Sequence, residues 1–453
     1  MKIELPRKVS FIISNLSLHG FEAYAVGGCV RDAILAKDPE DWDITTSATP
    51  EEIKGLFRHT VDTGIEHGTV TVLLGKESFE VTTYRIDGAY EDGRHPSSVT
   101  FTKSLLEDLK RRDFTINAMA YNDEARLVDL VGGMKDLNHH LIRCVGDPKK
   151  RFAEDYLRIL RALRFSAQLG FKLERHTMEG MVELAPNLLQ ISSERIREEL
   201  LKLLLSDNPE KIYEGYQLGI TKIILPEWDA MVGVEQKNLY HSHDVAGHTL
   251  MALRATQNDK ILRLVMLFHD MGKPQTKTTD AKGVDHFIGH DRVSEQMAKD
   301  IMSRLRFDKE TTKKVTKLVA YHNYPLNTTP RAVRRAVNRI GVELFPYYLA
   351  VRVADLKAKS YYERKERLKK VVHIRYLFLK LLHEKQCISL EGLAIKGQDL
   401  IVMGVAPGPE IGRILDEMLE FVLDYPNYNH KDVLVPLAKK LVDKMKLGSN
   451  TVK

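Results

Sequence analysis

The spacing of apolar residues changes near residue 150 of this 453-residue chain. Before that point, short apolar runs predict a strand over residues 21–26, a helix over 29–37 and a polar–apolar strand over 41–47. Two β-branched runs around a Gly-Lys-Glu-Ser turn, within residues 67–85, predict a hairpin. The first part is therefore expected to be a small sheet with flanking helices.

Capping signals predict two helices beside this sheet. Thr49, Pro50 and Glu52 have the spacing of a capping box with proline in the first turn. Ser104 and Glu107 repeat the capping-box spacing. Both helices are therefore expected to begin at these residues.

Helical spacing predominates beyond residue 150. Residues 149–171 place apolar side chains on one helical face up to Gly170, which predicts one amphipathic helix with a glycine end. Residues 192–209 have the same pattern. No fixed-period repeat is present, which excludes a solenoid.

Composition adds limits to this picture. A chain of this length that is 43% apolar is expected to form two to four domains, and a net charge of +6 suits RNA or nucleotide phosphates without requiring them. Cys29, Cys144 and Cys387 lie far apart, so neither disulfides nor a zinc knuckle is expected. No apolar run approaches the roughly 18 residues of a membrane span, and no signal-peptide core follows the start. We expect a cytoplasmic protein without a membrane segment.

Two carboxylates carry the first candidate chemistry. Asp41 and Asp43 lie two apart on a predicted strand and are expected to share a face. Such a pair can hold Mg²⁺ for phosphoryl transfer. Upstream, Gly27 and Gly28 allow a close backbone approach to phosphate at the start of a helix. Because GGCVRD precedes DWD, a catalytic site is favoured over a solvated strand end.

The motifs resemble those of class II tRNA CCA-adding enzymes and bacterial poly(A) polymerases, a branch of the polymerase β superfamily. GGCVRD with DWD resembles their nucleotidyltransferase motif, RRDFTINA their second motif, EDYLR their EDxxR motif and SERI the start of a later helical motif. The similarity covers about residues 20–225. It implies that Asp41 and Asp43 are catalytic and that the second motif contacts the ribose and triphosphate. The expected nucleotide-binding residues are Gly27, Gly28, Arg31, Asp32, Arg112, Asp113, Asn117, Asp155, Arg158 and Arg161.

Asp155 and Arg158 also suggest how a base is selected. They lie three apart on a predicted helix and are expected to share a face. A carboxylate accepts and a guanidinium donates, so the pair can face the edge of cytosine or adenine. The resemblance implies the same role. The alternative is an ordinary surface ion pair.

Residues 85–99 form a polar, turn-rich segment that is either a plain loop or a functional one. In the resembled family, a flexible segment at this place is implied in the switch from C to A addition. Arg85, Asp87 and Arg94 are its candidate residues. Glu80 is either a third acidic neighbour of the metal site or a partly exposed strand carboxylate.

A second set of metal-capable residues begins near residue 240. Imidazole with carboxylate suits Mn, Fe, Ni, Co or Zn. The order H…HD…H…H…D resembles the HD phosphohydrolase superfamily over about residues 238–360, although a structural relic is the alternative. It implies a one- or two-metal site that activates water, with 2′,3′-cyclic phosphate or related RNA ends as a hypothetical substrate. His286 falls within this order, and the expected ligands are His248, His269, Asp270, His290, His322 and Asp355.

The C-terminal part is predicted to be helical with basic patches, which are either a solvated face or an RNA-binding one. A tight turn at a helix start, formed by Gly404, Pro407, Gly408 and Pro409, resembles the closing segment of the same family. It is equally consistent with an RNA phosphate site and with a rigid turn that seats the helix.

Together these observations predict an α+β fold. The expected parts are a polymerase β-like nucleotidyltransferase head with a small mixed sheet, a helical neck, an HD domain and a helical tail. They are expected to span residues 1–145, 146–235, 236–360 and 361–453, respectively. The expected reaction is CCA addition to tRNA from CTP and ATP with Mg²⁺. The alternatives are an A-adding enzyme or poly(A) polymerase, an RNA-binding HD hydrolase, and an enzyme of signalling nucleotides. The oligomeric state stays open.

Overall fold

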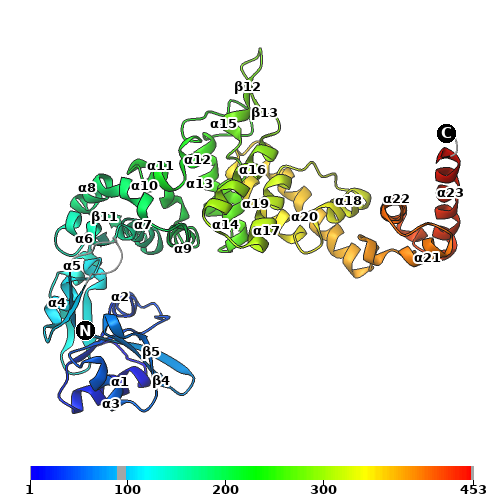
Figure 1. Ribbon diagram of the computed structural model, residues 1–453. Helices are drawn as coiled ribbons and strands as arrows, with labels where there is room; N and C mark the ends of the chain where they lie inside the picture. Colours follow the sequence, from blue (N-terminus) through cyan, green and yellow to red (C-terminus); the bar gives the residue numbers. More distant parts are fainter. Residues whose placement is uncertain (1, 89–97, 450–453) are drawn as a thin grey trace. The chain divides into compact units, whose positions relative to one another are not determined.

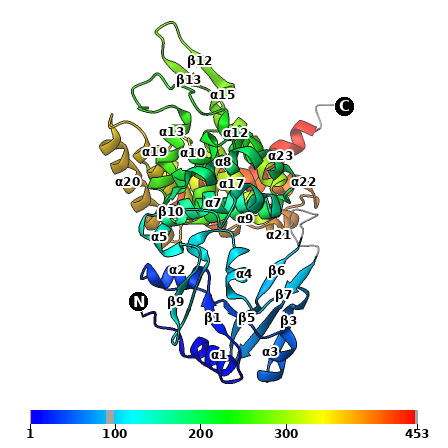
Figure 2. The ribbon, with the colours of Figure 1, turned by 90° about the vertical axis from the view of Figure 1, so that its left-hand side faces the viewer.

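The chain divides into two compact units (Figures 1 and 2). The computed structural model describes residues 2–88 and 98–449, so Arg94 lies outside the described residues. The first unit comprises residues 1–230 with 304–306, and the second comprises residues 231–303 with 307–453.

A seven-stranded mixed sheet forms the base of the first unit, with the order β3-β4-β5-β2-β1-β8-β9. Neighbouring strands are antiparallel except β2 and β5, which are parallel with Ile44 beside Val81. The strands are β1 (Ala23–Val26), β2 (Ile44–Thr46), β3 (Thr60–Gly64), β4 (Thr69–Leu74), β5 (Glu77–Thr83), β8 (Met119–Asn122) and β9 (Arg126–Asp129). The predicted hairpin is β4–β5, and the small mixed sheet is confirmed.

Short helices and ribbons complete this sheet. α1 packs on β1 and α3, and Thr49 and Glu52 form the predicted capping box of α3. Ser104 precedes α4 as predicted, but its side chain makes no capping hydrogen bond. The elements are α1 (Arg7–Leu18), α2 (Gly28–Ile34), α3 (Pro50–Leu56), α4 (Leu105–Lys110), α5 (Gly133–Asn138) and the separate ribbon of β6 (Arg85–Asp87) with β7 (Val99–Phe101).

Helices continue the first unit beyond the sheet. α7 packs on α9 and α6 on α8. Gly170 ends α7 in the left-handed region at φ 70°, as the glycine signal predicts. The helices are α6 (Pro148–Glu154), α7 (Leu157–Leu169), α8 (Arg175–Leu184), α9 (Ser193–Leu204), α10 (Ile212–Gln217), α11 (Thr221–Ile224) and α12 (Pro226–Asp229), with a two-residue pair of β10 (Leu141–Ile142) and β11 (Lys172–Leu173).

Two local predictions are wrong. Asp41 and Asp43 precede β2 instead of lying within it, because the regular strand begins at Ile44. Residues 149–171 form two helices, α6 and α7, because Asp155 takes an extended conformation with φ −147° and ψ 104°. Apolar spacing did not reveal this break.

The second unit is helical apart from one hairpin. α19 packs against α13, α14 and α20. Pro409 opens α22 after Gly408, so the predicted turn at a helix start is present. The elements are α13 (Val245–Ala255), α14 (Lys260–Phe268), α15 (Lys273–Thr276), β12 (Lys277–Thr279), β13 (Asp285–Phe287), α16 (His290–Arg304), α17 (Lys309–Tyr321), α18 (Pro330–Ile340), α19 (Phe345–Ala358), α20 (Arg364–His383), α21 (Gly397–Val402), α22 (Pro409–Asp424) and α23 (Lys431–Ser449). Within residues 2–88 and 98–449, no helix combines the length and apolar character needed to cross a bilayer.

Candidate functional site

The acidic pair of the first unit lies beside the glycine pair that follows β1. The Val26 amide donates to the Asp43 carbonyl at 3.0 Å, which ties the DWD segment to β1. Gly27 has φ 90°, and a Cβ there would lie 3.2 Å from Arg112 Nη1 and 3.9 Å from Asp43 Oδ2. Glycine at this position therefore lets a carboxylate and a guanidinium approach the start of α2 together.

Glu80 completes an acidic group with Asp41 and Asp43. Burial raises the pKa of Asp43. The Arg112 guanidinium opposes this increase, and the negative charge of Asp41 adds to it. Partial burial and the charges of Asp43 and Asp41 raise the pKa of Glu80 as well. The three carboxylates therefore repel one another, a state that a divalent cation relieves.

A chain of hydrogen bonds links the first and second motifs. The Arg31 guanidinium pairs with Asp32 at 2.8 Å and donates to Asn117 Oδ1 at 2.5 Å. Asn117 in turn donates to Asp113 Oδ1 at 3.3 Å, and Arg161 Nε donates to Asp113 Oδ2 at 2.8 Å. Although burial opposes ionisation, Arg161 lowers the pKa of Asp113 to about 2. Asp113 is thus an anion that fixes the Arg161 guanidinium directly and, through the Asn117 amide, connects to Arg31.

Asp108 anchors the two arginines of the second motif. Its buried carboxylate accepts from Arg111 Nη2 at 2.8 Å, from Arg112 Nη2 at 3.4 Å and from Thr45 Oγ1 at 3.1 Å. Burial raises its pKa, but the two guanidiniums and the hydroxyl outweigh this and hold the pKa below its ordinary value. Asp108 was not predicted as a site residue, although its spacing of four from Arg112 was a usable signal.

Asp155 and Arg158 line the same cavity but do not pair with each other. Asp155 Oδ2 accepts from Arg195 Nη2 at 2.7 Å, and Oδ1 accepts from the Leu157 amide at 3.0 Å. Arg158 pairs with Glu154 and donates to the Arg151 carbonyl at 2.9 Å. The alternative of a plain Asp155–Arg158 ion pair is therefore wrong, as is the shared helix.

One cavity of about 970 Å³ brings these groups together. It is lined by every predicted catalytic and nucleotide-binding residue of the first unit. Arg164, Phe165 and Arg195 line it too and were not predicted as site residues. The Arg164 guanidinium lies 4.1 Å from the Phe165 ring centroid and 3.0 Å from the buried Glu199 carboxylate. Arg195 stood in the SERI motif, so the sequence held a signal for it.

The polar segment after β5 is partly described. Arg85 pairs with Asp87 at 2.9 Å within β6, and Asp87 lies 4.0 Å from Arg111 Nη1. The segment is thus connected to the second motif through Arg111. Its proposed part in switching stays a prediction.

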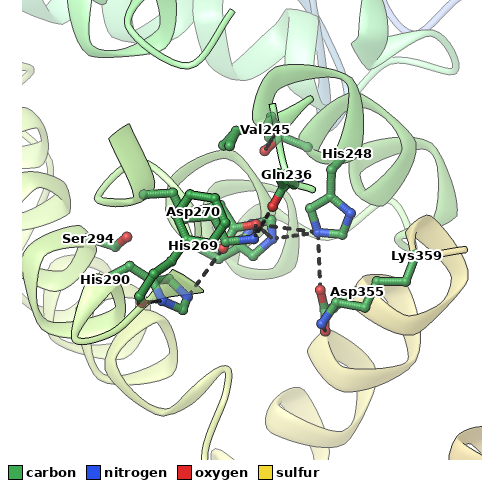
Figure 3. Close-up of polar contacts among 12 residues, drawn as sticks. Gln236, Val245, His248, His269, Asp270, His290, Ser294, Asp355 and Lys359 are labelled. Atoms are coloured by element: carbon green, nitrogen blue, oxygen red, sulfur yellow. Dashed lines mark hydrogen bonds and ion pairs between the residues drawn. The ribbon is translucent and has the colours of Figure 1, made fainter. Parts of the chain in front are cut away.

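Four of the six predicted ligands, the histidines, surround a fifth, Asp270, and the sixth, Asp355, contacts His248. Figure 3 shows Asp270 with His248, His269, His290 and Asp355 around it. Asp270 Oδ2 lies 3.4 Å from His248 Nε2 and 3.2 Å from His269 Nε2, while Oδ1 lies 3.5 Å from His290 Nε2 and 3.7 Å from His322 Nε2. Asp355 Oδ1 lies 3.1 Å from His248 Nε2. Asp270 therefore bridges two ligand groups. His286, which was not among the expected ligands, lines the same cavity and pairs with Asp280 at 2.9 Å.

The histidines are held in the form that binds metals. The Nδ1 atoms of His269, His290 and His322 bond to backbone carbonyls at 2.6–2.8 Å, which directs each Nε2 toward Asp270. Burial lowers the pKa of His248, His290 and His322, which favours neutral imidazole. The Nε2 atoms of His269, His290 and His322 thus offer a lone pair to a cation. The donor set fits one or two transition-metal ions.

Two lysines that the sequence analysis missed contact the carboxylate ligands. Lys273 Nζ lies 2.7 Å from Asp270 Oδ2 and from Gln236 Oε1, and Lys359 Nζ lies 2.7 Å from Asp355 Oδ2. Burial opposes ionisation of Asp270, but His269 and Lys273 hold its pKa well below the ordinary value. The spacing of Lys273, three residues after Asp270, was the available signal.

Three family models match successive parts of the chain. The Poly A polymerase head domain matches residues 23–143, the probable RNA and SrmB-binding site of polymerase A matches 170–232, and the HD domain matches 238–374. The three models follow the order of the predicted head, neck and HD domain.

Whole-chain relatives agree with these models. The CCA-adding enzyme of Enterococcus faecalis is 35% identical over 95% of this chain and 94% of its own length, and that of Leuconostoc citreum is 34% identical over 96% of both. The match to the Limosilactobacillus reuteri enzyme is 52% identical but spans 44% of this chain and 49% of that protein. The Bacillus stearothermophilus CCA-adding enzyme in complex with CTP superposes with a TM-score of 0.75 at 28% identity, over 98% of this chain and 100% of that one.

Proposed function

This chain belongs to the CCA-adding enzymes and is a nucleotidyltransferase, and from this premise we propose that it adds C, C and A to the 3′ end of tRNA, using CTP and ATP without a template. One observation carries the proposal: a single cavity holds the acidic pair, the arginines of the second motif and the base-selecting candidates Asp155 and Arg158. A CTP complex of a 28% identical relative supports CTP as a substrate.

The residues of the cavity have different roles in binding the metal ion and the nucleotide. Asp41 and Asp43, with Glu80 beside them, would hold Mg²⁺, which supplies charge neutralisation at the triphosphate and acidifies the attacking tRNA hydroxyl. Arg112 faces the same carboxylates and is placed for the phosphates. The Arg31–Asn117–Asp113–Arg161 chain fixes its polar groups before the nucleotide arrives, so little ordering cost remains when it binds.

Base selection falls to Asp155 and Arg158. Arg195 and Glu154 hold these two side chains at the wall of the cavity, where a carboxylate can accept from a base edge and a guanidinium can donate to it. A wrong base would leave a buried polar group without a partner, which is the stronger basis for rejection.

A product-length experiment tests this proposal. Purified protein with Mg²⁺ is incubated with tRNA that ends before CCA, at CC, or complete, together with CTP, ATP or both. We expect growth by three nucleotides that then stops, and Asp43→Asn should lower the rate at least about 10³-fold because the cation loses a ligand. Long A tails would instead identify a poly(A) polymerase, and growth only of the CC-ended tRNA an A-adding enzyme.

A second activity is favoured by the convergent ligands of the HD unit. We propose hydrolysis of a phosphoester at an RNA end, such as a 2′,3′-cyclic phosphate, in which water adds to phosphorus, one P–O bond to the ribose breaks and the freed oxygen takes a proton. The six ligands would hold one or two metal ions, which supply a water of lowered pKa. His269→Ala should abolish hydrolysis and bound metal, and spare CCA addition. Unchanged metal content and hydrolysis would refute this activity.

A further inference from the structure

A cavity of about 940 Å³ is lined by four of the HD ligands, Asp270, His290, His322 and Asp355, and also by tyrosines and arginines that no metal requires. Arg292 is one of these further residues, and the other five are Tyr240, Tyr321, Tyr324, Arg339 and Arg367. They form two groups, and each group adjoins a different part of the ligand set. The metal-bound phosphate alone does not account for two aromatic groups.

The first group centres on the ring of Tyr240, which we call the first stacking platform because its aromatic face can stack on a base. Its ring is braced by the Arg367 guanidinium, 4.1 Å from the ring centroid, and by the edge of Tyr362 at 5.3 Å. Its carbonyl accepts from the Ser360 amide at 2.8 Å, and the preceding residue, Lys359, holds the ligand Asp355. This ring is therefore fixed beside the Asp355 part of the site.

The second platform is Tyr324 with Tyr321. Tyr321 directly precedes the ligand His322, and the two tyrosine rings lie 5.7 Å apart. Arg339 Nη1 donates to the Tyr324 hydroxyl at 3.3 Å, and the hydroxyl of Tyr348 donates to the Tyr324 carbonyl at 3.2 Å. This platform is therefore fixed beside the His290–His322 part of the site.

A plain packing role does not fit these rings. Tyr348 is buried in the helical core, whereas Tyr240 and Tyr324 are partly exposed and face the cavity. Single-stranded nucleic acids are bound by such exposed rings for the bases together with arginines for the backbone. A mononucleotide or a phosphomonoester offers one base at most.

We propose that the HD site engages two nucleosides of a single-stranded RNA, with one base stacked on Tyr240 and one on Tyr324. The substrate class is thus an oligonucleotide end, and a mononucleotide is a poor substrate. The choice of a phosphoester at the metal centre rests on the hydrolase activity proposed above, but the stacking of two bases does not require turnover. Arg367 and Arg339 offset the charge of the strand.

Photochemical cross-linking tests the binding independently of hydrolysis. The full chain with Mn²⁺ is irradiated with a short oligouridylate that carries 5-iodouracil at its last two positions and a 2′,3′-cyclic phosphate, and the cross-linked peptides are identified by mass spectrometry. We expect cross-links at Tyr240 and Tyr324, each lost in Tyr240→Leu or Tyr324→Leu. Cross-links confined to other residues, or unchanged in both variants, would overturn the proposal.

A comparison of kcat/KM for two substrates is the second test of this proposal. We compare kcat/KM for the oligonucleotide with kcat/KM for uridine 2′,3′-cyclic phosphate. Each leucine variant should lower the ratio of the first to the second about tenfold, because one base–aromatic stacking contact is lost. Tyr240→Phe and Tyr324→Phe keep the ring and should keep the ratio. Tyr376→Leu is the matched control, because Tyr376 is 59% exposed on α20 and does not line the cavity. An unchanged ratio in both leucine variants would refute base stacking.

The two proposals fail in different ways. If the wild-type protein hydrolyses neither compound with Mn²⁺ or Ni²⁺, the hydrolase activity is refuted, while the cross-links still decide whether two bases bind. If hydrolysis occurs but no cross-link forms at either tyrosine, the hydrolase stands and the two-base site falls.

Discussion

Asp155 is held by two donors, and neither of them is Arg158. Arg195 fixes one carboxylate oxygen at 2.7 Å and the Leu157 amide fixes the other at 3.0 Å. A carboxylate that selects a base must not rotate, because a free rotamer would accept from several bases. We therefore propose that Arg195 is a positioning residue, which acts on base choice through Asp155.

Replacing Arg195 with methionine should loosen base selection. The change keeps much of the side-chain volume and removes the donor to Asp155, so we expect the preference for CTP over UTP at the first addition to fall about tenfold, which is the effect of one charged hydrogen bond. Single-turnover kcat/KM values for both nucleotides on tRNA without CCA measure this.

Arg175→Met is the matched control for Arg195→Met. The Arg175 side chain is 82% exposed, pairs with Glu179 and does not line the cavity. It should leave the CTP preference unchanged. An equal loss of rate with CTP and UTP in Arg195→Met would show that the residue serves folding and not selection.

Residue identities were the most predictable feature of the site. Every residue assigned to the nucleotide cavity from motifs lines it, because polar side chains at fixed spacing in short segments are visible in a sequence. Their partners were not. Arg195 lies 40 residues from Asp155, so tertiary packing decides this contact, whereas Lys359 lies four residues after Asp355 and its spacing was a usable signal.

Elements were predicted where local signals are strong and missed where a side chain interrupts a regular pattern. The capping box at Thr49 and the glycine end at Gly170 are such local signals. The break between α6 and α7 occurs at Asp155, whose own side chain accepts from the Leu157 amide in place of the helical carbonyl. Apolar periodicity continues across this break, so it cannot reveal it.

Gly272 lies in close contact with the first residues of α16, the helix that begins at the ligand His290. A Cβ at this position would lie 2.6 Å from the His290 carbonyl oxygen, 2.7 Å from the Ser294 amide nitrogen and 2.8 Å from Val293 Cβ, all in the first turn of α16. Gly272→Ala should therefore displace α16 and with it His290. We expect the metal affinity of the HD unit to fall about tenfold or more. The free energy of unfolding should fall by about 1–3 kcal/mol, and CCA addition should be unchanged.

Metal titration and denaturant unfolding of the Gly272→Ala protein measure these effects. Gly412→Ala in α22 is the control, because a Cβ there meets nothing within 4 Å and should be neutral or slightly stabilising. Metal affinity equal to that of the wild type would show that α16 does not depend on this close approach.

At the scale of the whole molecule, two units carry two chemically different donor sets. The first unit offers only carboxylates, from Asp41, Asp43 and Glu80, whereas the second offers four imidazoles and two carboxylates. The order of the parts was predictable because each resembles a known family in its motifs, and the family models follow that order. The three boundaries between the four predicted parts remain our proposal, and the chain divides into its two compact units at residue 230.

This difference in donors predicts that the two activities respond to different metals. After chelation and dialysis both activities should be lost. Mg²⁺ alone should restore CCA addition, because hard oxygen ligands suit it, and should leave phosphoester hydrolysis below about a tenth of its full value. Mn²⁺ or Ni²⁺ should restore hydrolysis, because imidazole nitrogens bind transition metals far more strongly than they bind Mg²⁺.

Reciprocal variants assign each metal response to its unit. Asp43→Asn should remove the Mg²⁺-dependent addition and keep the Mn²⁺-dependent hydrolysis, and His269→Ala should do the reverse. Because the ligands of each site come from one unit only, neither variant should alter the metal response of the other. Recovery of hydrolysis with Mg²⁺ alone would mean that carboxylates, not imidazoles, dominate the HD site, and the proposed assignment of its ligands would be wrong.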